Sequence, residues 1–410
     1  MTSFAERSRG LVAGRERSVA LVIGLLVLAL LYPSIVETLQ DLPLVGDFVP
    51  GVGSLVVMLA FTTMAVGLNI VVGYAGLLDL GYVAFYAAGA YTAGWFASQQ
   101  FDQVTFHFGS VGVVDTLPGI HLSMWLVLLI AGLFTLLVGI LIGLPTLRLR
   151  GDYLAIVTLG FGEIIPQVVR NADEEGIGFD LTHGTFGIAP IDSLGFGSLG
   201  ESLGLPESFQ TSSDRARWFY LTAVAILLVT VFVSVRLRDS RLGRAWIAIR
   251  EDETAAAAMG VPLMRTKTWS YAIGAFFGGV AGAFYASFKS GAFPADFYFN
   301  ISVFLLCMVI LGGMGSVWGV ILGGMILGYL NIEGLATIGS KIQDAGLDFD
   351  PTKYQFGIYG VIIVAMMLFR PTGLVPERRH KIELEEGVHD TPLYDVQTEG
   401  TLTDRDRHGD

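Results

Sequence analysis

Two acidic residues, Asp79 and Glu163, stand within long apolar stretches of this 410-residue chain. A charge in the hydrocarbon of a membrane is costly, so such a residue is by default a candidate for a functional role. Gly73 and Gly76 can interrupt a helix and expose its backbone groups to a zwitterionic solute. Residues of this kind favour the passage of a small polar molecule. The predicted path residues are Asn69, Gly73, Gly76, Asp79, Thr158 and Glu163.

The same residues also allow structural interpretations. The two glycines could serve only to let helices pack closely. Glu163 could pair with Arg148 or Arg150 instead of contacting a solute. Asp79, near the expected end of a helix, could simply be exposed to water. The sequence leaves these alternatives open.

Motifs for catalysis are missing from the chain. None of its five lysines follows the glycines of a phosphate-binding loop, and no His-Glu-x-x-His motif is present. The six histidines do not pair at metal-ligand spacing, and the single Cys307 excludes an intramolecular disulfide. We therefore predict no enzyme activity, no metal site and no cofactor.

Composition identifies the class of protein. Hydrophobic residues make up 53% of the chain, charged residues only 15%, and the mean hydropathy is +0.62. An ordinary soluble domain has about 25% charged residues. We predict an all-α polytopic membrane protein, in contact with lipid in the plasma membrane, and exclude a soluble enzyme, a nucleic-acid binder and a disulfide-built secreted module.

Apolar stretches predict about ten transmembrane helices, with eight as the alternative, since a helix needs about 20 residues to cross the hydrocarbon. The stretch 301–332 is one apolar run broken at 312–316, which predicts two short helices joined by a tight turn. The expected spans cover residues 18–36, 54–72, 77–96, 122–144, 153–169, 218–235, 269–288, 301–314, 317–332 and 354–369.

Basic residues orient these spans. Most of them fall in segments that are cytoplasmic if the N-terminus is inside, as the positive-inside rule requires. The exceptions are Arg170, Arg215, Arg217, Lys289, Lys341 and Lys353. We therefore expect an even number of spans, with both termini in the cytoplasm.

The domain boundaries follow from these spans. We expect a cytoplasmic tail at 1–17 and a transmembrane domain at 18–370, which includes an external loop at 170–217 and a cytoplasmic segment at 237–268. Residues 371–410 form an acidic tail with few large apolar residues, which predicts disorder. The net charge of −12 fits either ordinary solvated loops or adaptation to a high-salt medium.

The cytoplasmic stretch 240–262 has the composition of a helix, with Gly260 placed to end it and Pro262 to stop its continuation. Helical spacing brings Leu242, Trp246, Ile249, Ala256 and Met259 to one face. Such a helix between two spans can dock into a groove of a soluble partner. The alternative is an amphipathic helix on lipid headgroups, but those are usually basic and bulky, unlike the acidic 251–253 and the alanine run.

This segment resembles the coupling loop of the branched-chain amino-acid class of ABC importer permeases. Five further motifs resemble that family in the same order, and together they cover roughly residues 55–375 in the pattern of the larger, M-type subunit. They are Gly67–Gly81, Leu147–Glu163, Thr182–Ile188, Ala281–Ala286 and Leu311–Gly319. One departure lies near the expected path, where Asp79-Leu80-Gly81-Tyr82 replaces the family's usual Ser-Leu-Gly-His.

The resemblance implies a permease subunit of an ATP-driven importer for branched-chain or other hydrophobic amino acids. Its partners would be a second permease, two cytoplasmic ATPase subunits and an external solute-binding protein. A urea or short-amide importer and an ion-driven secondary transporter remain alternatives. The residues expected to couple to the ATPase are Gly243, Arg244, Arg250, Glu251, Asp252, Ala256, Met259 and Gly260.

Overall fold

The computed structural model describes residues 29–36, 38–41, 46–110, 116–149, 151–195, 215–344, 346 and 349–376. The predicted tail at 1–17, most of the first expected span and residues 377–410 lie outside this part of the chain. Most of the described residues are helical and few lie in strands, which confirms the all-α polytopic fold class.

Seven segments among the described residues are long and apolar enough to cross a membrane. Two further helices, α3 (Val83–Phe96) and α12 (Phe299–Gly312), are shorter, at 14 residues each. The seven segments contain α2 (Val52–Asn69), α4 (Met124–Thr146), α5 (Asp152–Arg170), α8 (Arg215–Arg238), α11 (Leu263–Lys289), α13 (Val317–Tyr329) with α14 (Leu335–Asp344), and α15 (Gln355–Phe369).

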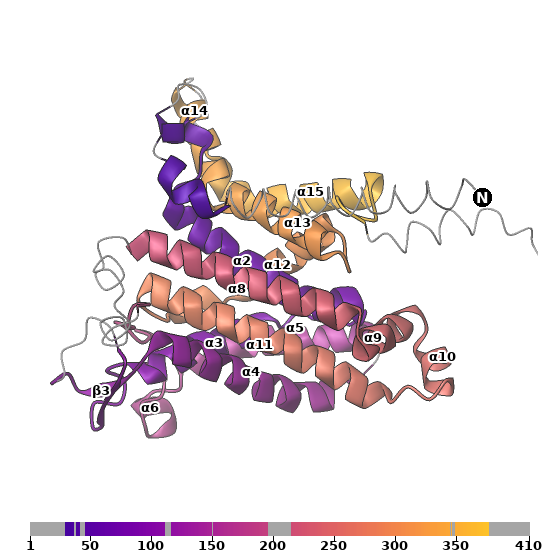
Figure 1. Ribbon diagram of the computed structural model, residues 1–410, viewed down its shortest axis with the longest axis horizontal. Helices are drawn as coiled ribbons and strands as arrows, with labels where there is room; N and C mark the ends of the chain where they lie inside the picture. The colour runs from indigo at the N-terminus through magenta and orange to yellow at the C-terminus, as the bar shows by residue number, and fades with distance from the viewer. Residues whose placement is uncertain are drawn as a thin grey trace, which may run out of the picture.

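The long helices run roughly side by side and give the molecule two ends (Figure 1). The helices α9 (Arg241–Glu251) and α10 (Glu253–Ala258) lie at one end, hereafter the α9 end. The strands and the short helix α6 (Glu174–Ile177) lie at the other, hereafter the sheet end. Helix α11 packs against α4, α3 and α2, and α2 also packs against α13 and α8. Helix α2 therefore connects the group formed by α3, α4 and α11 with α8 and α13.

Small residues let α11 approach its neighbours closely. A Cβ on Gly279 would lie 2.0 Å from Thr135 Oγ1 of α4, and one on Gly89 of α3 would lie 2.1 Å from the Gly279 carbonyl oxygen. In a membrane, where lipid tails are as apolar as leucine, such backbone approach is a main source of helix association. These glycines of α11 and α3 are therefore needed for packing.

Helix α2 does not end in a regular way. It continues into a π-helical turn, η2 (Ile70–Tyr74), and residues 75–82 that follow are irregular. The expected span at 77–96 is thus helical only from Val83, whose backbone N–H donates to Ser302 Oγ at 2.9 Å. A second π-helical turn, η6 (Leu330–Gly334), lies between α13 and α14. Turns of this type occur frequently at functional sites.

The predicted break at 312–316 is confirmed. Helix α12 ends at Gly312, α13 begins at Val317, and Gly313 (φ 112°) and Gly315 (φ 89°) adopt conformations that favour glycine. Of the expected tail, residues 371–376 are described, and they fold back onto this turn. Leu374 N donates to Leu311 O at 3.0 Å, and Val375 N donates to Gly312 O at 3.1 Å.

The helix expected over 240–262 is in fact two helices, because Asp252 between them is extended (φ −153°, ψ 108°). Trp246, Ile249 and Ala256 are buried, whereas Met259 is 85% exposed. The prediction that Met259 shares one face with these residues is therefore wrong. The break at Asp252 reorients the second helix and removes the common helical phase on which that prediction depended.

A small sheet and a loop make up the sheet end. Strands β1 (Ala97–Ser98), β2 (Thr105–Phe108) and β3 (Gly119–Leu122) have the order β1-β3-β2, with β1 antiparallel and β2 parallel to β3. His121 of β3 is 1% exposed, and its Nδ1 lies 2.8 Å from Asp192 Oδ2. Burial raises the pKa of the Asp192 carboxyl, and its hydrogen bond to His121 opposes that effect. The pair ties the loop before α8 to the sheet.

Candidate functional site

The predicted coupling and path residues meet at the α9 end. Arg250 of α9 donates from its guanidinium to the Gly73 carbonyl oxygen of the π-helical turn η2, at 2.5 Å. Gly76, with φ 67°, lies so close to this arginine that a Cβ there would be 2.8 Å from Arg250 Cγ. Any larger residue at Gly76 would push α9 away from the helix break. The hydrogen bond therefore depends on both glycines.

The same helix break contacts the turn between α12 and α13. Asn69 is fully buried, and its Oδ1 accepts a hydrogen bond from Gly315 N at 2.9 Å. A Cβ on Gly73 would meet both Asn69 Oδ1 at 2.0 Å and Gly315 N at 2.5 Å. Asn69 Nδ2 is buried without a hydrogen-bond partner among the described residues. The glycine-rich segments around Gly73 and Gly315 thus lie against each other, and the carboxamide of Asn69 bridges them.

Asp79 and Thr158 form a second group beside this one. Both are fully buried, so exposure of Asp79 is ruled out. Asp79 Oδ1 accepts from Gly81 N at 2.8 Å, and Thr158 Oγ1 accepts from Leu80 N at 3.0 Å. A Cβ on Gly81 would lie 2.3 Å from the Thr158 carbonyl oxygen. These contacts join the irregular residues 75–82 to α5.

Glu163 lies apart from these residues, on the outward face of α5. It is exposed, and no ion pair between it and Arg148 is present; Arg150 is outside the described residues. Its neighbours at helical spacing include the exposed Ile156 and Gln167 and the open Gly160. The rest of this face is largely apolar, with Ile156, Ile164 and Val168 exposed, as the outward face of α4 is with Leu133 and Leu141. Glu163 is therefore an acidic group on an otherwise mostly apolar face.

The α9–α10 pair is built around local caps. Ser240 Oγ accepts from Gly243 N at 3.2 Å, and a Cβ on Gly243 would lie 2.2 Å from Arg238 O. Asp252 caps α10 by accepting from Thr254 N and Ala255 N at 2.7 and 3.0 Å. Gly260, with φ 84°, follows the helix end as predicted.

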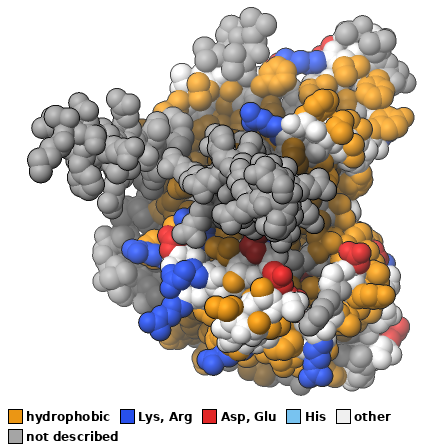
Figure 2. Space-filling model, turned by 90° about the vertical axis from the view of Figure 1, so that its right-hand side faces the viewer, with side chains coloured by type: hydrophobic (Ala, Val, Ile, Leu, Met, Phe, Trp, Pro, Cys, Tyr) orange, Lys and Arg blue, Asp and Glu red, His pale blue; other side chains and the backbone are white. Residues whose placement is uncertain are grey.

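The surface of this end carries the remaining predicted residues. Arg244, Glu251 and Met259 are exposed, and Arg244 also donates to the Asp239 carbonyl oxygen at 3.0 Å. Figure 2 views the molecule from the α9 end and shows basic side chains distributed around it. The exposed alanines of α10 have short side chains, so the surface beside Met259 is shallow.

The ion pair between Lys267 and Glu253 in this region was not predicted from the sequence. Lys267 of α11 is only 3% exposed, and its Nζ lies 2.8 Å from Glu253 Oε2 of α10. The only signal was that a lysine stands at the start of an apolar stretch, and spacing alone could not indicate its partner. The role of Gly315 as a backbone donor to Asn69 was missed for the same reason.

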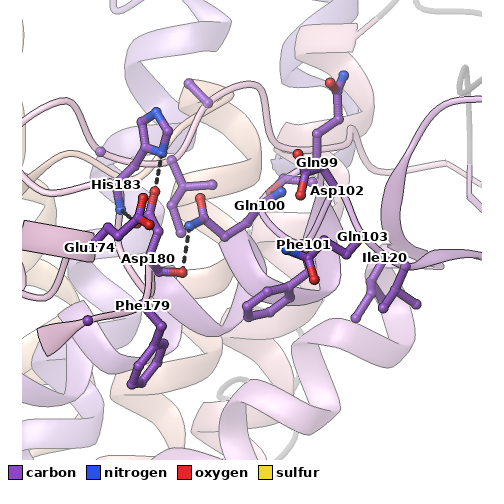
Figure 3. Close-up of a pocket in the computed structure, with 16 residues that line it drawn as sticks. Gln99, Gln100, Phe101, Asp102, Gln103, Ile120, Glu174, Phe179, Asp180 and His183 are labelled. Atoms are coloured by element: carbon purple, nitrogen blue, oxygen red, sulfur yellow. Dashed lines mark hydrogen bonds and ion pairs between the residues drawn. The ribbon is translucent and has the colours of Figure 1, made fainter.

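A large cavity opens at the sheet end, with a volume of about 780 Å³ (Figure 3). Its polar lining comes from the loop after β1 and from the loop around α6. Gln100 Nε2 donates to the Asp180 carbonyl oxygen at 3.2 Å, and His183 Nδ1 lies 2.7 Å from Asp180 Oδ2. Apolar side chains such as Phe101, Ile120 and Phe179 line part of the cavity, and its glutamines and acidic residues are Gln99, Gln100, Asp102, Gln103, Glu174 and Asp180.

Comparisons with known proteins agree with this architecture. Residues 52–367 match the family model for branched-chain amino acid transport system permease components. The high-affinity branched-chain amino acid transport permease LivM of Escherichia coli K12 is 36% identical over 342 residues, covering 80% of this chain and 70% of that protein. The probable LivM of Methanocaldococcus jannaschii is 26% identical over 333 residues, covering 77% and 90%.

A different permease of the same systems matches more weakly. LivH of Escherichia coli K12 is 29% identical over 175 residues, which is 42% of this chain and 51% of that protein. No solved structure gives a significant match. Both the coverage and the identity favour the M-type pattern. The chain is a multi-pass plasma-membrane protein that belongs to the family of permease components of branched-chain amino acid transport systems.

Proposed function

We propose that this chain forms half of the translocation path of an ATP-driven importer for branched-chain or other hydrophobic amino acids. The hydrogen bond from Arg250 to the Gly73 carbonyl oxygen is the observation that carries the proposal. This hydrogen bond connects α9, at the end of the bundle, directly to the π-helical turn η2 that interrupts α2. A movement of α9 therefore reaches the buried Asn69 and Gly315 through contacts of a few ångströms.

Two ATPase subunits drive this movement from the cytoplasm, one on each permease. The shallow, exposed surface of α10 with Met259 suits docking into a groove of such a partner, and ATP hydrolysis resides entirely in those subunits. The α9 end is cytoplasmic in this proposal, as are both termini. The basic residues of this end, among them Arg238, Arg241, Arg244 and Arg265, support the orientation.

The second permease covers the outward face of α5. An exposed carboxylate such as Glu163 in a membrane helix is unfavourable against lipid, so its face needs a protein partner or a watery path. The similarity to both LivM and LivH supports a pair of unequal subunits. The path then runs along the outward face of α5 past Glu163, and the buried Thr158, Asp79 and Asn69, with Gly73 and Gly76, reach it only when the contacts between α5 and residues 75–82 open.

An external solute-binding protein delivers the amino acid at the sheet end. The glutamine-rich and acidic rim of the large cavity there offers hydrogen-bonding groups for such a docking partner. The expected external loop supplies part of that rim, including Glu174 and Asp180.

The test is uptake by a reconstituted assembly. The chain, a second permease, the ATPases and the binding protein are placed in liposomes with ATP inside and labelled L-leucine outside. We expect leucine to accumulate only when ATP and the binding protein are both present, with no competition by urea. Accumulation driven by an ion gradient without ATP, or competition by urea, would overturn the proposal.

A further inference from the structure

A second, smaller cavity of about 170 Å³ lies at the α9 end. Three structural parts form its walls: the irregular residues 75–78, the start of α5 and the end of α9 with the adjacent ion pair. Pockets for drug-sized ligands measure roughly 300–1,000 Å³. This one is too small for a nucleotide, yet it exceeds the roughly 30 Å³ occupied by one water molecule in the liquid. Its size fits one small organic molecule.

Charged groups of both signs line this cavity. Arg250 and Lys267 bring positive charge, and Asp152 and Glu253 bring negative charge. Lys267 is 3% exposed and is held by Glu253 at 2.8 Å, so one charged group is fixed in the wall. Because Lys267 and Glu253 form an ion pair with each other, Arg250 and Asp152 are the other charged groups of the lining. One positive and one negative group at one place are complementary to a zwitterion.

The remaining lining is apolar. Leu78, Leu149 and Ile249 contribute aliphatic side chains to the same cavity. Ligand sites usually combine such a surface with a few well-placed polar groups. A free hydrophobic α-amino acid has the matching groups, because it carries a zwitterionic head and an aliphatic side chain.

We propose that this cavity is a binding site for a free hydrophobic amino acid, and that its occupancy slows import when the internal concentration is high. The proposal rests on the function given above, in which the α9 end faces the cytoplasm. The ligand is then the transported product. A ligand that spans α9, residues 75–78 and α5 stabilises the arrangement in which these parts enclose it, because it binds that arrangement more tightly than others. Movement of α9 relative to the helix break then becomes less favourable.

The first experiment measures binding directly. The complete permease–ATPase complex, in nanodiscs and without the solute-binding protein, is titrated with labelled L-leucine. We expect saturable binding that unlabelled isoleucine displaces and that leucinamide and 4-methylpentanoate, which each lack one charge, do not. Absence of binding at millimolar leucine, or equal displacement by the two analogues, overturns the proposal.

Variants separate this site from the translocation path. Leu149→Trp fills the cavity at a position that is already 37% exposed, and we expect the affinity to fall at least tenfold. Leu141→Trp is the matched control, on the outward face of α4 and 72% exposed. Unchanged affinity in Leu149→Trp contradicts the proposal.

The second experiment measures the consequence in proteoliposomes. Unlabelled leucine loaded inside should lower the initial uptake rate of the wild type and of Leu141→Trp, but not that of Leu149→Trp. Equal inhibition in all three overturns the regulatory role. Uptake with an empty lumen is measured in parallel, so that failure of the importer itself is distinguished from failure of this site.

Discussion

The guanidinium of Arg250 and the carboxamide of Asn69 make consecutive hydrogen bonds that link α9, the helix break and the turn between α12 and α13. Arg250 holds the Gly73 carbonyl oxygen, and Asn69, one helical turn earlier, holds Gly315 N. Arg250 belongs to a segment at the surface, whereas Asn69 is fully buried. Two polar side chains thus connect three segments that are distant in the sequence.

Replacing Asn69 tests its buried hydrogen bond with Gly315 N. Asn69→Leu leaves Gly315 N without its acceptor inside the bundle, which costs about 1–3 kcal/mol. We expect a lower unfolding temperature in detergent and a lower uptake rate. Asn171→Leu, at an exposed position after α5, is the matched control. Wild-type stability of Asn69→Leu would show that the bond is dispensable.

The carboxylate of Glu163 is a separate matter, because no contact ties it to the helix break. We expect Glu163→Gln to lower leucine uptake while the amount of protein in the membrane stays the same. Quantitative blotting and initial uptake rates measure the two quantities. Asp344→Asn, on the exposed end of α14, is the control and should have no effect. Normal uptake in Glu163→Gln removes this residue from the path.

Among the elements, α10 is a short helix that depends on its cap. It has six residues, too few for a stable isolated helix, and Asp252 supplies two acceptor contacts at its start. Loss of such a cap costs about 0.5–2 kcal/mol. We expect Asp252→Ala to lower the amount of ATPase that co-purifies with the permease.

The matched control for this cap lies at the opposite end of the molecule. Asp173 caps α6, with its Oδ1 accepting from Gly176 N at 2.9 Å. Asp173→Ala should leave ATPase association unchanged. Equal loss of ATPase from both variants would point to general destabilisation instead of a role for α10.

Helix α11 depends on its glycines. Gly279→Val places side-chain atoms where Thr135 Oγ1 already lies, and overpacking of this kind costs about 1–3 kcal/mol or more. Gly357→Val on α15 has no atom within 4 Å of the new Cβ and serves as the control. Thermal unfolding in detergent should show a lower midpoint for Gly279→Val only. Equal midpoints would mean that α4 and α11 can separate at little cost.

At the scale of the whole molecule, composition and apolar length were enough to predict the fold class and most of the spans. They placed α4 well because it is continuously apolar, and they missed the first turns of α8 and α11, which carry Arg215, Arg217, Arg265 and Lys267. They placed the start of α3 too early because residues 77–82 are apolar without being helical. Hydropathy reports burial in general and does not distinguish a helix from an irregular buried segment.

The candidate site was predictable only in part. Glycines at 73 and 76 and the break at 312–316 were visible, since glycine marks places where a backbone bends or approaches another. That Gly73 and Gly315 lie against each other, and that Arg250 reaches Gly73, depends on tertiary contacts between residues separated by 177 or more positions. The break at Asp252 was missed because the alanine-rich composition favours helix on both sides of it.

The measurement that most directly tests the central claim compares uptake with ATP hydrolysis in Arg250→Gln. The glutamine is too short to reproduce the contact of the guanidinium with Gly73, while the surface of α10 that meets the ATPase is unchanged. We expect the ATPase to remain bound and to hydrolyse ATP, and leucine transported per ATP to fall at least tenfold. Arg241→Gln, at an exposed position at the start of the same helix, should transport normally. An unchanged ratio of leucine to ATP in Arg250→Gln would contradict the account.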